Sequence, residues 1–210
     1  MPKQISIATI MDAAIKGISN AQRDYEIWSG GCWLWEAPEY LAGTYVAQEI
    51  ARVAGKEGPW YLTMEHGAKQ AIKDAGAVGS GKLHRKIRPK GRFDLLLWWS
   101  SETPRAPIEI KCQVTEFEKI RADIERLEKV IHRKKSESSF QFGMSVFYTS
   151  AKDRTGKAAK EKTERRIVQI ISATRSHIGT DTELVVKKSA IKMVDDSAWS
   201  VVALVLKQLK

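Results

Sequence analysis

The N-terminal half of the chain carries the hydrophobic pattern of helices. Apolar residues recur at helical spacing between residues 6 and 27, which predicts a first helix: Ile7, Ile10, Met11, Ala14 and Ile18. The following segment breaks this pattern with glycines and a proline. A second helix is predicted from Pro38, a residue favoured in the first helical turn, to Gly55, which suits a helix C-terminus. Residues 68–77 predict a third helix, and residues 59–66 fit either a strand or the start of that helix.

The middle of the chain changes to the pattern of strands. Two apolar runs, residues 92–99 and 106–114, predict strands joined by a turn at residues 100–105. Thr115 and Glu118 then form the pattern of a capping box. The residues after it place one buried stripe on a helix: Phe117, Ile120, Ile124, Leu127 and Ile131.

The remainder alternates strands with a helix. Residues 138–150 predict a strand and residues 156–174 a helix, and residues 182–194 and 198–208 predict two closing strands. Helices therefore precede, interrupt and follow the strands. This order predicts a layered α/β domain with a mixed sheet.

The chain is basic, which changes the picture of its partners. It has 210 residues, enough for one sizeable domain, and a formal net charge of +10. The isoelectric point is about 9.6, so we expect attraction to polyanions, of which nucleic acid is the commonest and an anionic membrane a weaker candidate. Lysines that only solubilise the surface are the alternative.

The cysteines and the apolar stretches bear on the compartment. Cys32 and Cys112 are too few for a disulfide framework and form no CxxC pair, which fits reducing conditions. The first residues lack the pattern of a secretory signal, and no apolar stretch approaches the roughly 20 residues that cross a bilayer. We expect a cytoplasmic protein without membrane contact.

Three charged residues stand on the two apolar strands, where an isolated charge is costly unless it has a partner. Side chains alternate along a strand, so Glu109 and Lys111 share a face, and Asp94 can lie beside Glu109 if the strands pair. Two neighbouring carboxylates repel each other, but a divalent cation such as Mg²⁺ reverses the sign of that interaction. With a lysine beside them they contain the parts for metal-dependent phosphodiester hydrolysis.

The residues "FD" and "IEIK", which contain these charges, resemble the motif of the PD-(D/E)XK nuclease superfamily. Phe93 stands where the family has proline. The resemblance implies a restriction-endonuclease-like fold, a three-layer α/β/α core with a mixed central sheet. On this interpretation residues 1–37 are an N-terminal helical extension packed on the core, and residues 38–210 form the nuclease-like domain.

The resemblance also implies a function and a set of site residues. We expect a Mg²⁺-dependent nuclease that hydrolyses DNA, in our interpretation endonucleolytically, with Mn²⁺ as a substitute ion. Asp94 and Glu109 would bind the metal, with the carbonyl group of Ile110 as a further candidate ligand, and Lys111 would act beside them. Many members add a glutamate from the first core helix; Glu39 is the first choice, and Glu49 stays open. Gln113 shares the predicted face of Lys111 and is a weaker candidate for contact with a phosphate.

A basic segment precedes the first charged strand and is predicted to bind the DNA backbone. Its members follow one another without an acidic residue between them: Lys82, Arg85, Lys86, Arg88, Lys90 and Arg92. Residues 133–135, at the end of the helix after the motif, add three more basic side chains. Residues 76–83, "GAVGSGKL", imitate a P-loop, but Leu83 stands where the motif needs serine or threonine, so no nucleoside triphosphate is expected.

Other interpretations stay open from the sequence alone. Glu109 and Lys111 could form an ordinary ion pair on a hairpin, and Lys119 and Asp123 an i,i+4 pair on a helix surface. The protein could be a non-catalytic nucleic-acid-binding or regulatory protein on a degenerate nuclease fold, or a component that binds another protein. A homodimer is also open. Neither a zinc-hydrolase spacing nor an acyl-transfer motif is present.

Overall fold

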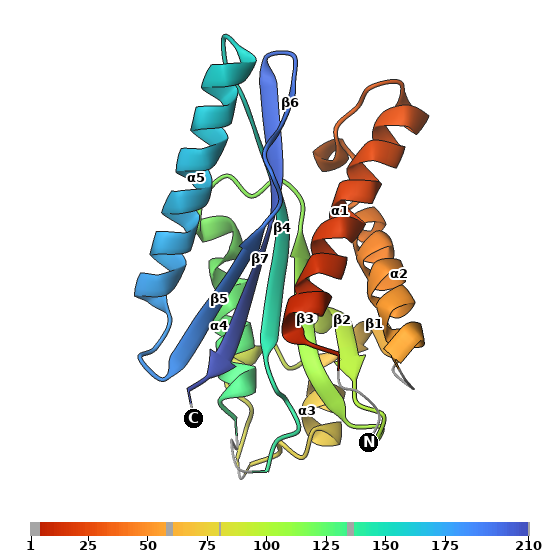
Figure 1. Ribbon diagram of the computed structural model, residues 1–210. Helices are drawn as coiled ribbons and strands as arrows, with labels where there is room; N and C mark the ends of the chain where they lie inside the picture. Colours follow the sequence, from red (N-terminus) through yellow and green to blue (C-terminus); the bar gives the residue numbers. More distant parts are fainter. Residues whose placement is uncertain (1–4, 58–60, 80, 134–136, 210) are drawn as a thin grey trace.

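The computed structural model describes residues 5–57, 61–79, 81–133 and 137–209, and of residues 54–57 the backbone only. Figure 1 shows a central sheet with helices on both of its faces. The sheet is mixed and has seven strands. The predicted α/β class is therefore confirmed. Within the described ranges, no helix is both long enough and apolar enough to pass through a bilayer.

The sheet has the order β1-β2-β3-β4-β7-β5, and β6 also pairs with β7. β3 and β4 are parallel, whereas every other described pair of strands is antiparallel. Parallel neighbours need a crossover connection, and the chain between β3 and β4 supplies a helix for it. The strands are β1 Leu62–Gly67, β2 Arg92–Trp98, β3 Pro104–Lys111, β4 Gly143–Lys152, β5 Thr182–Lys188, β6 Lys192–Val194 and β7 Ser197–Gln208.

Helices cover the sheet from two sides. α1 and α2 share an apolar core with one face of the strands, where Leu95 and Ile108 lie. α3 packs over the opposite face of β2, and α4 and α5 pack over the opposite face of β4 and β7. The helices are α1 Ile7–Ser29, α2 Glu39–Glu57, α3 Ala68–Asp74, α4 Glu118–Ile131 and α5 Gly156–His177, with short 3-10 helices η1 Leu34–Glu36 and η2 Arg85–Ile87.

α1 forms where its sequence predicts it. The hydroxyl group of Ser6 accepts a hydrogen bond from the backbone N–H of Thr9 at 3.0 Å, and the helix ends at Gly30 in the left-handed conformation. Its apolar stripe is buried against α2 and β7. The segment expected to be an extension thus belongs to the same hydrophobic core as the sheet.

Several predicted boundaries were wrong. Thr115 does not cap α4, because the helix begins only at Glu118, with Phe117 as a cap that makes no side-chain hydrogen bond. The strand predicted to reach residue 114 ends at Lys111. Residues 182–194 form two strands with a break between them. The strand predicted at residues 138–150 runs from Gly143 to Lys152. For residues 59–66 both a strand and the start of a helix were open, and their described part belongs mainly to the strand β1, Leu62–Gly67.

Two glycines inside α1 and α2 give opposite predictions. A Cβ atom on Gly17 would lie 2.6 Å from the Cα atom of Val46, so Gly17→Ala should destabilise the protein by about 1–3 kcal/mol. A Cβ atom on Gly43 would meet only ordinary contacts at 3.9 Å, so Gly43→Ala should stabilise it by roughly 0.5–1 kcal/mol through helix propensity. Urea unfolding measures both changes. Equal midpoints for the two variants would contradict this packing of α1 on α2.

Candidate active site at the end of the β2–β3 hairpin

Asp94 and Glu109 lie at the open end of the β2–β3 hairpin. Leu95 pairs with Ile108 in the antiparallel register of β2 and β3. The next pair in this register, toward the start of β2 and the end of β3, is Asp94 with Glu109. The carboxylate of Asp94 accepts a hydrogen bond from the backbone N–H of Ile110 at 2.6 Å. Asp94 therefore continues the pairing of the two strands with its side chain, at the point where their described backbone pairs end.

Lys111 joins this strand end to α2. Its Nζ donates to Oε1 of Glu39 at 2.8 Å, and the backbone N–H of Cys112 donates to the same carboxylate at 3.3 Å. Burial alone would lower the pKa of Lys111, but the hydrogen bond and charge of Glu39, together with the charges of Asp123 and Asp94, outweigh it and raise that pKa. Glu39, which was predicted from the family resemblance, thus contacts Lys111, the lysine of the motif.

Glu49 lies elsewhere. It is buried against α1, where it pairs with Lys16 at 2.9 Å and accepts from Asn20 at 3.1 Å, and it also pairs with Arg52 of its own helix. These contacts are with α1 and with α2 itself, and none is with the hairpin. The second choice for a helical glutamate is therefore not brought to the cluster.

Glu109 is held by a residue that the sequence analysis did not single out. Nη1 of Arg126, on α4, donates to Oε1 of Glu109 at 2.5 Å, and both side chains are almost fully buried. Arg126 also donates to the carbonyl groups of Ile87 at 3.0 Å and Arg92 at 2.8 Å. Its guanidinium group lies 4.1 Å from the centre of the Phe93 ring. Glu109 is thus bound to α4 and not to Lys111.

The two hairpin carboxyl groups have raised pKa values. Burial raises the pKa of Asp94, and the charges of Glu39 and Asp123 add to this, against the hydrogen bond from Ile110 and the charge of Lys111. Burial raises the pKa of Glu109 to about 8, although the charge of Arg126 opposes the rise. The positive groups among the described residues therefore do not fully offset the cost of burying these two negative charges. A bound cation would lower that cost.

The carboxylates of Asp94 and Glu109 meet only some of the requirements of a metal site. Ile110 occupies one oxygen of Asp94 and Arg126 one oxygen of Glu109, and no further hydrogen bond to either carboxylate is found among the described residues. One oxygen of each carboxylate thus remains for a metal. Over the described part of the chain, however, no group of three or more His, Cys, Asp or Glu side chains is placed to hold a metal ion.

Asp123 is a second residue that the sequence analysis misjudged. The predicted surface pair with Lys119 is wrong, because Asp123 is 4% exposed and pairs with Arg88 at 2.5 Å. Its charge acts on Asp94, Glu109 and Lys111. A signal was present, since Asp123 lies three residues after Ile120 and four before Leu127, on the buried stripe of α4.

The predicted DNA-binding residues divide into two groups. Lys86 pairs with Glu125 at 3.1 Å, and Arg88 pairs with Asp123, so these two hold η2 against α4. The other four members of the basic segment are exposed, and no ion pair is found for them among the described residues: Lys82, Arg85, Lys90 and Arg92.

Two further candidates have other surroundings. Gln113 does not share the face of Lys111, because it follows the end of β3 in a left-handed conformation. Its Oε1 accepts a hydrogen bond from Ser150 at 3.0 Å. Arg133 donates to the carbonyl group of Ala77 at 2.7 Å, and residues 134 and 135 lie outside the described residues.

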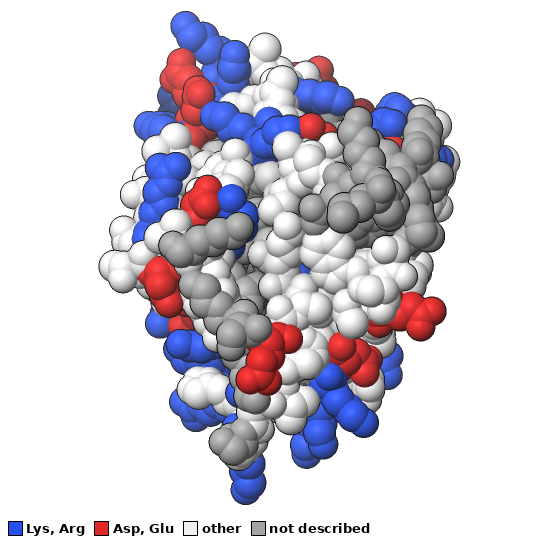
Figure 2. All heavy atoms as spheres, turned by 60° about the horizontal axis from the view of Figure 1, so that its bottom comes forward, with Lys and Arg blue, Asp and Glu red and all other residues white. Residues whose placement is uncertain are grey.

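A groove of about 1160 Å³ runs beside α3 and the start of β2. It is lined by six basic side chains, and no acidic residue is among its described lining: Lys69, Lys73, Lys82, Lys90, Arg92 and Arg133. Figure 2, which turns the lower end of Figure 1 forward, shows basic and acidic side chains around an uncharged centre. The face drawn in Figure 2 thus carries charges of both signs, whereas the described lining of the groove is basic without an acidic residue.

Comparisons with models of protein families, with curated proteins and with solved structures found no match.

The buried ion pair predicts a large effect on stability. Arg126→Met should destabilise the protein by about 3–5 kcal/mol, because it leaves the buried carboxylate of Glu109 and two carbonyl groups without their donor. Arg121→Met on the same helix is the matched control, since Arg121 is exposed and its ion pairs are worth about 1 kcal/mol or less. Urea unfolding compares the two variants. Similar losses in both would rule out this role of Arg126.

Proposed function

We propose that this protein is a Mg²⁺-dependent nuclease that hydrolyses phosphodiester bonds of DNA. The observation that carries the proposal is the meeting of Glu39, Asp94 and Lys111 at one end of the hairpin, from segments far apart in the chain. The resemblance of the motif predicts these three residues. It predicts Glu39 from its place near the start of a helix, without any knowledge of its contact with Lys111. Their proximity supports a common task.

The order of elements supports the same proposal. After α2 come β1, the short helices α3 and η2, and the β2–β3 hairpin, then the crossover helix α4 and the parallel strand β4; β1, β2 and β3 are antiparallel neighbours in the sheet. This is the arrangement expected for a restriction-endonuclease-like core, with the motif on the hairpin and helices before and after it. We propose that fold for residues 38–210, with α1 as an addition that shares the core.

Each residue has a proposed role. Asp94 and Glu109 would hold Mg²⁺ through the oxygens that Ile110 and Arg126 leave open, and Mn²⁺ would replace it. The ion, when bound, polarises a phosphoryl oxygen and makes an attacking water more acidic. Lys111 places its ammonium group where negative charge develops on the phosphate, and Glu39 holds that ammonium group in place.

The basic groove supplies the proposed contact with the DNA backbone. Arg92 begins β2 and lines the groove, so the groove reaches the strand on which Asp94 lies. Lys and Arg side chains bind phosphates without regard to sequence. A cytoplasmic location is proposed together with this substrate.

One observation favours a second candidate function. Arg126 brings a positive charge to Glu109, where the nuclease proposal needs a cation. A non-catalytic nucleic-acid-binding protein on a degenerate nuclease fold would keep such a pair permanently. It would bind DNA through the groove and cleave nothing.

Cleavage of DNA separates the two candidates. Closed circular duplex, linear duplex and single-stranded DNA are incubated with Mg²⁺ or with EDTA, and the products are resolved on a gel. We expect wild-type protein to cleave only with Mg²⁺, and Lys111→Ala to lose about hundredfold or more in rate, because the charge on the phosphate loses its partner. Lys119→Ala, an exposed lysine on α4, is the control and should cleave as wild type does.

The outcomes of this experiment are distinct. DNA binding without cleavage at any concentration of Mg²⁺ or Mn²⁺ would favour the non-catalytic candidate. Equal rates for wild type and Lys111→Ala would assign the activity to another site or to a contaminant.

The basic segment before Asp94 makes a separate prediction about salt. Replacing Arg85, Lys90 and Arg92 together by Ala should make the dependence of duplex binding on salt less steep, by roughly 0.9 in logarithmic slope for each phosphate that the variant no longer binds. Binding is measured by fluorescence anisotropy in EDTA at several salt concentrations. The control replaces three exposed basic residues of α5: Lys157, Lys160 and Arg165. If both triple variants show the same slope, the basic segment has no special part in binding.

A further inference from the structure

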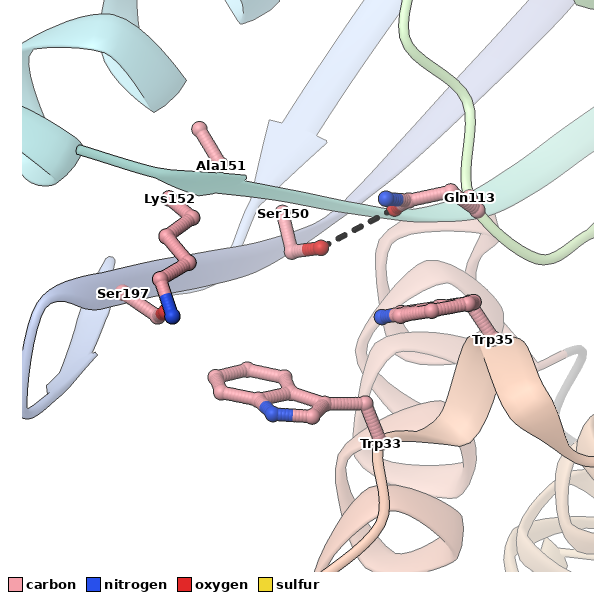
Figure 3. Close-up of a pocket in the computed structure, with 7 residues that line it drawn as sticks. All are labelled: Trp33, Trp35, Gln113, Ser150, Ala151, Lys152 and Ser197. Atoms are coloured by element: carbon pink, nitrogen blue, oxygen red, sulfur yellow. Dashed lines mark hydrogen bonds between the residues drawn. The ribbon is translucent and has the colours of Figure 1, made fainter.

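A small pocket lies between η1 and the ends of two strands, β4 and β7. Its volume is about 150 Å³, and the rings of Trp33 and Trp35 form much of its lining together with Gln113, Ser150 and Lys152. Figure 3 shows both indole rings projecting from the segment around η1 toward the space beside β4, with the ammonium group of Lys152 directed to the same side.

The pocket adjoins the candidate active site through two segments of chain. Gln113 follows Lys111 by two residues, and Trp35 shortly precedes Glu39. The ion pair between Lys111 and Glu39 therefore fixes both segments where they enter the pocket. A ligand extending from the hairpin end along the end of β4 would reach the tryptophans.

The chemistry of the lining is aromatic with two polar groups. Trp35 is 47% exposed, which leaves its ring accessible to a ligand. Gln113 accepts from Ser150 through Oε1, and no partner for its Nε2 is found among the described residues, so this amide group can donate to a ligand. Lys152 is mostly exposed and adds a positive charge beside Asp196, with which it pairs at 3.1 Å.

We propose that this pocket receives an unpaired nucleobase, stacked on Trp33 and Trp35, from the DNA strand that the neighbouring site cleaves. The inference rests on the proposed function for the identity of the ligand as DNA. It narrows the substrate to DNA with a single-stranded or frayed segment. Lys152 contacts a phosphate of that segment, and Gln113 donates to an edge of the base.

The size of the pocket favours a single base over a whole small molecule. Pockets for complete ligands begin at about 300 Å³, so this one takes only a part of a larger molecule. In a duplex the faces of each base are covered by its neighbours, whereas an unpaired base offers a free face to an aromatic ring. Every base has such a face, so the pocket requires a single strand without requiring a sequence.

Binding without cleavage tests the inference. In EDTA, fluorescence anisotropy compares a labelled oligothymidine with a blunt-ended hairpin duplex of equal length. Trp35→Ala should weaken binding of the single strand by roughly tenfold, as expected for the loss of one stacked base, and binding of the duplex by less than about twofold. Trp35→Phe should retain most of the affinity for the single strand, because it keeps an aromatic face.

Trp28→Ala is the matched control. Trp28 is another exposed tryptophan, on α1 and outside the described lining of the pocket, and its replacement should change neither affinity. Equal weakening of single strand and duplex by Trp35→Ala, or no weakening of either, would overturn the proposed base pocket. The proposal would also be overturned if Trp35→Ala bound the single strand as wild type does but lost affinity for an apolar peptide, because the pocket would then be a peptide-binding site.

The outcome is independent of catalysis, because EDTA prevents any cleavage by a metal. A selective loss in Trp35→Ala supports the base pocket even if wild-type protein cleaves no DNA. Conversely, Mg²⁺-dependent cleavage that depends on Lys111, with no selective effect of Trp35→Ala, leaves the nuclease proposal in place and removes the base pocket.

Discussion

The arrangement around the hairpin depends on the buried guanidinium group of Arg126. It binds the carboxylate of Glu109 on β3, the carbonyl group of Arg92 on β2 and the carbonyl group of Ile87 in η2. A buried charge is tolerable only when such partners surround it. α4, both strands and the basic segment are consequently held to one another, and the end of the hairpin cannot move independently of the helix behind it.

The charged residues at this end of the sheet form ion pairs that stabilise the fold, and the same residues are the proposed ligands of a metal ion and a phosphate. Glu39 positions Lys111, and Asp123 positions Arg88, through ion pairs between elements distant in sequence. A phosphate or a cation that enters must compete with these partners or use the oxygens that they leave. The ion pairs that stabilise the fold therefore determine the affinity that a ligand needs in order to displace them.

Local patterns in the sequence predicted the hairpin, the stripe of α4 and the α/β class, because these depend on alternation along neighbouring residues. The capping box at Thr115 failed because tertiary contact overrides it: the N–H of Val114 donates to the carbonyl group of Tyr148 at 2.9 Å, which keeps this segment on β4 and delays the helix. Gln113 was misplaced for a related reason, since its left-handed backbone ends the alternation of β3. The burial of Asp123 could be read from the stripe of α4, but the partners of Asp123 and Arg126 could not, because they lie on other elements and a sequence pattern does not name them. Glu39 came from a family resemblance and not from periodicity.

The contact of α1 with β7 has a consequence for how the protein is made. α1 leaves the ribosome well before β7, the last described strand, yet Ile10 and Val201 lie in one core. The ion pair between Asp12 and Lys187 also joins these distant parts of the chain. The apolar side of the nascent helix therefore stays without its partner strand until β7 has been synthesised, a period in which a chaperone has an apolar surface to bind.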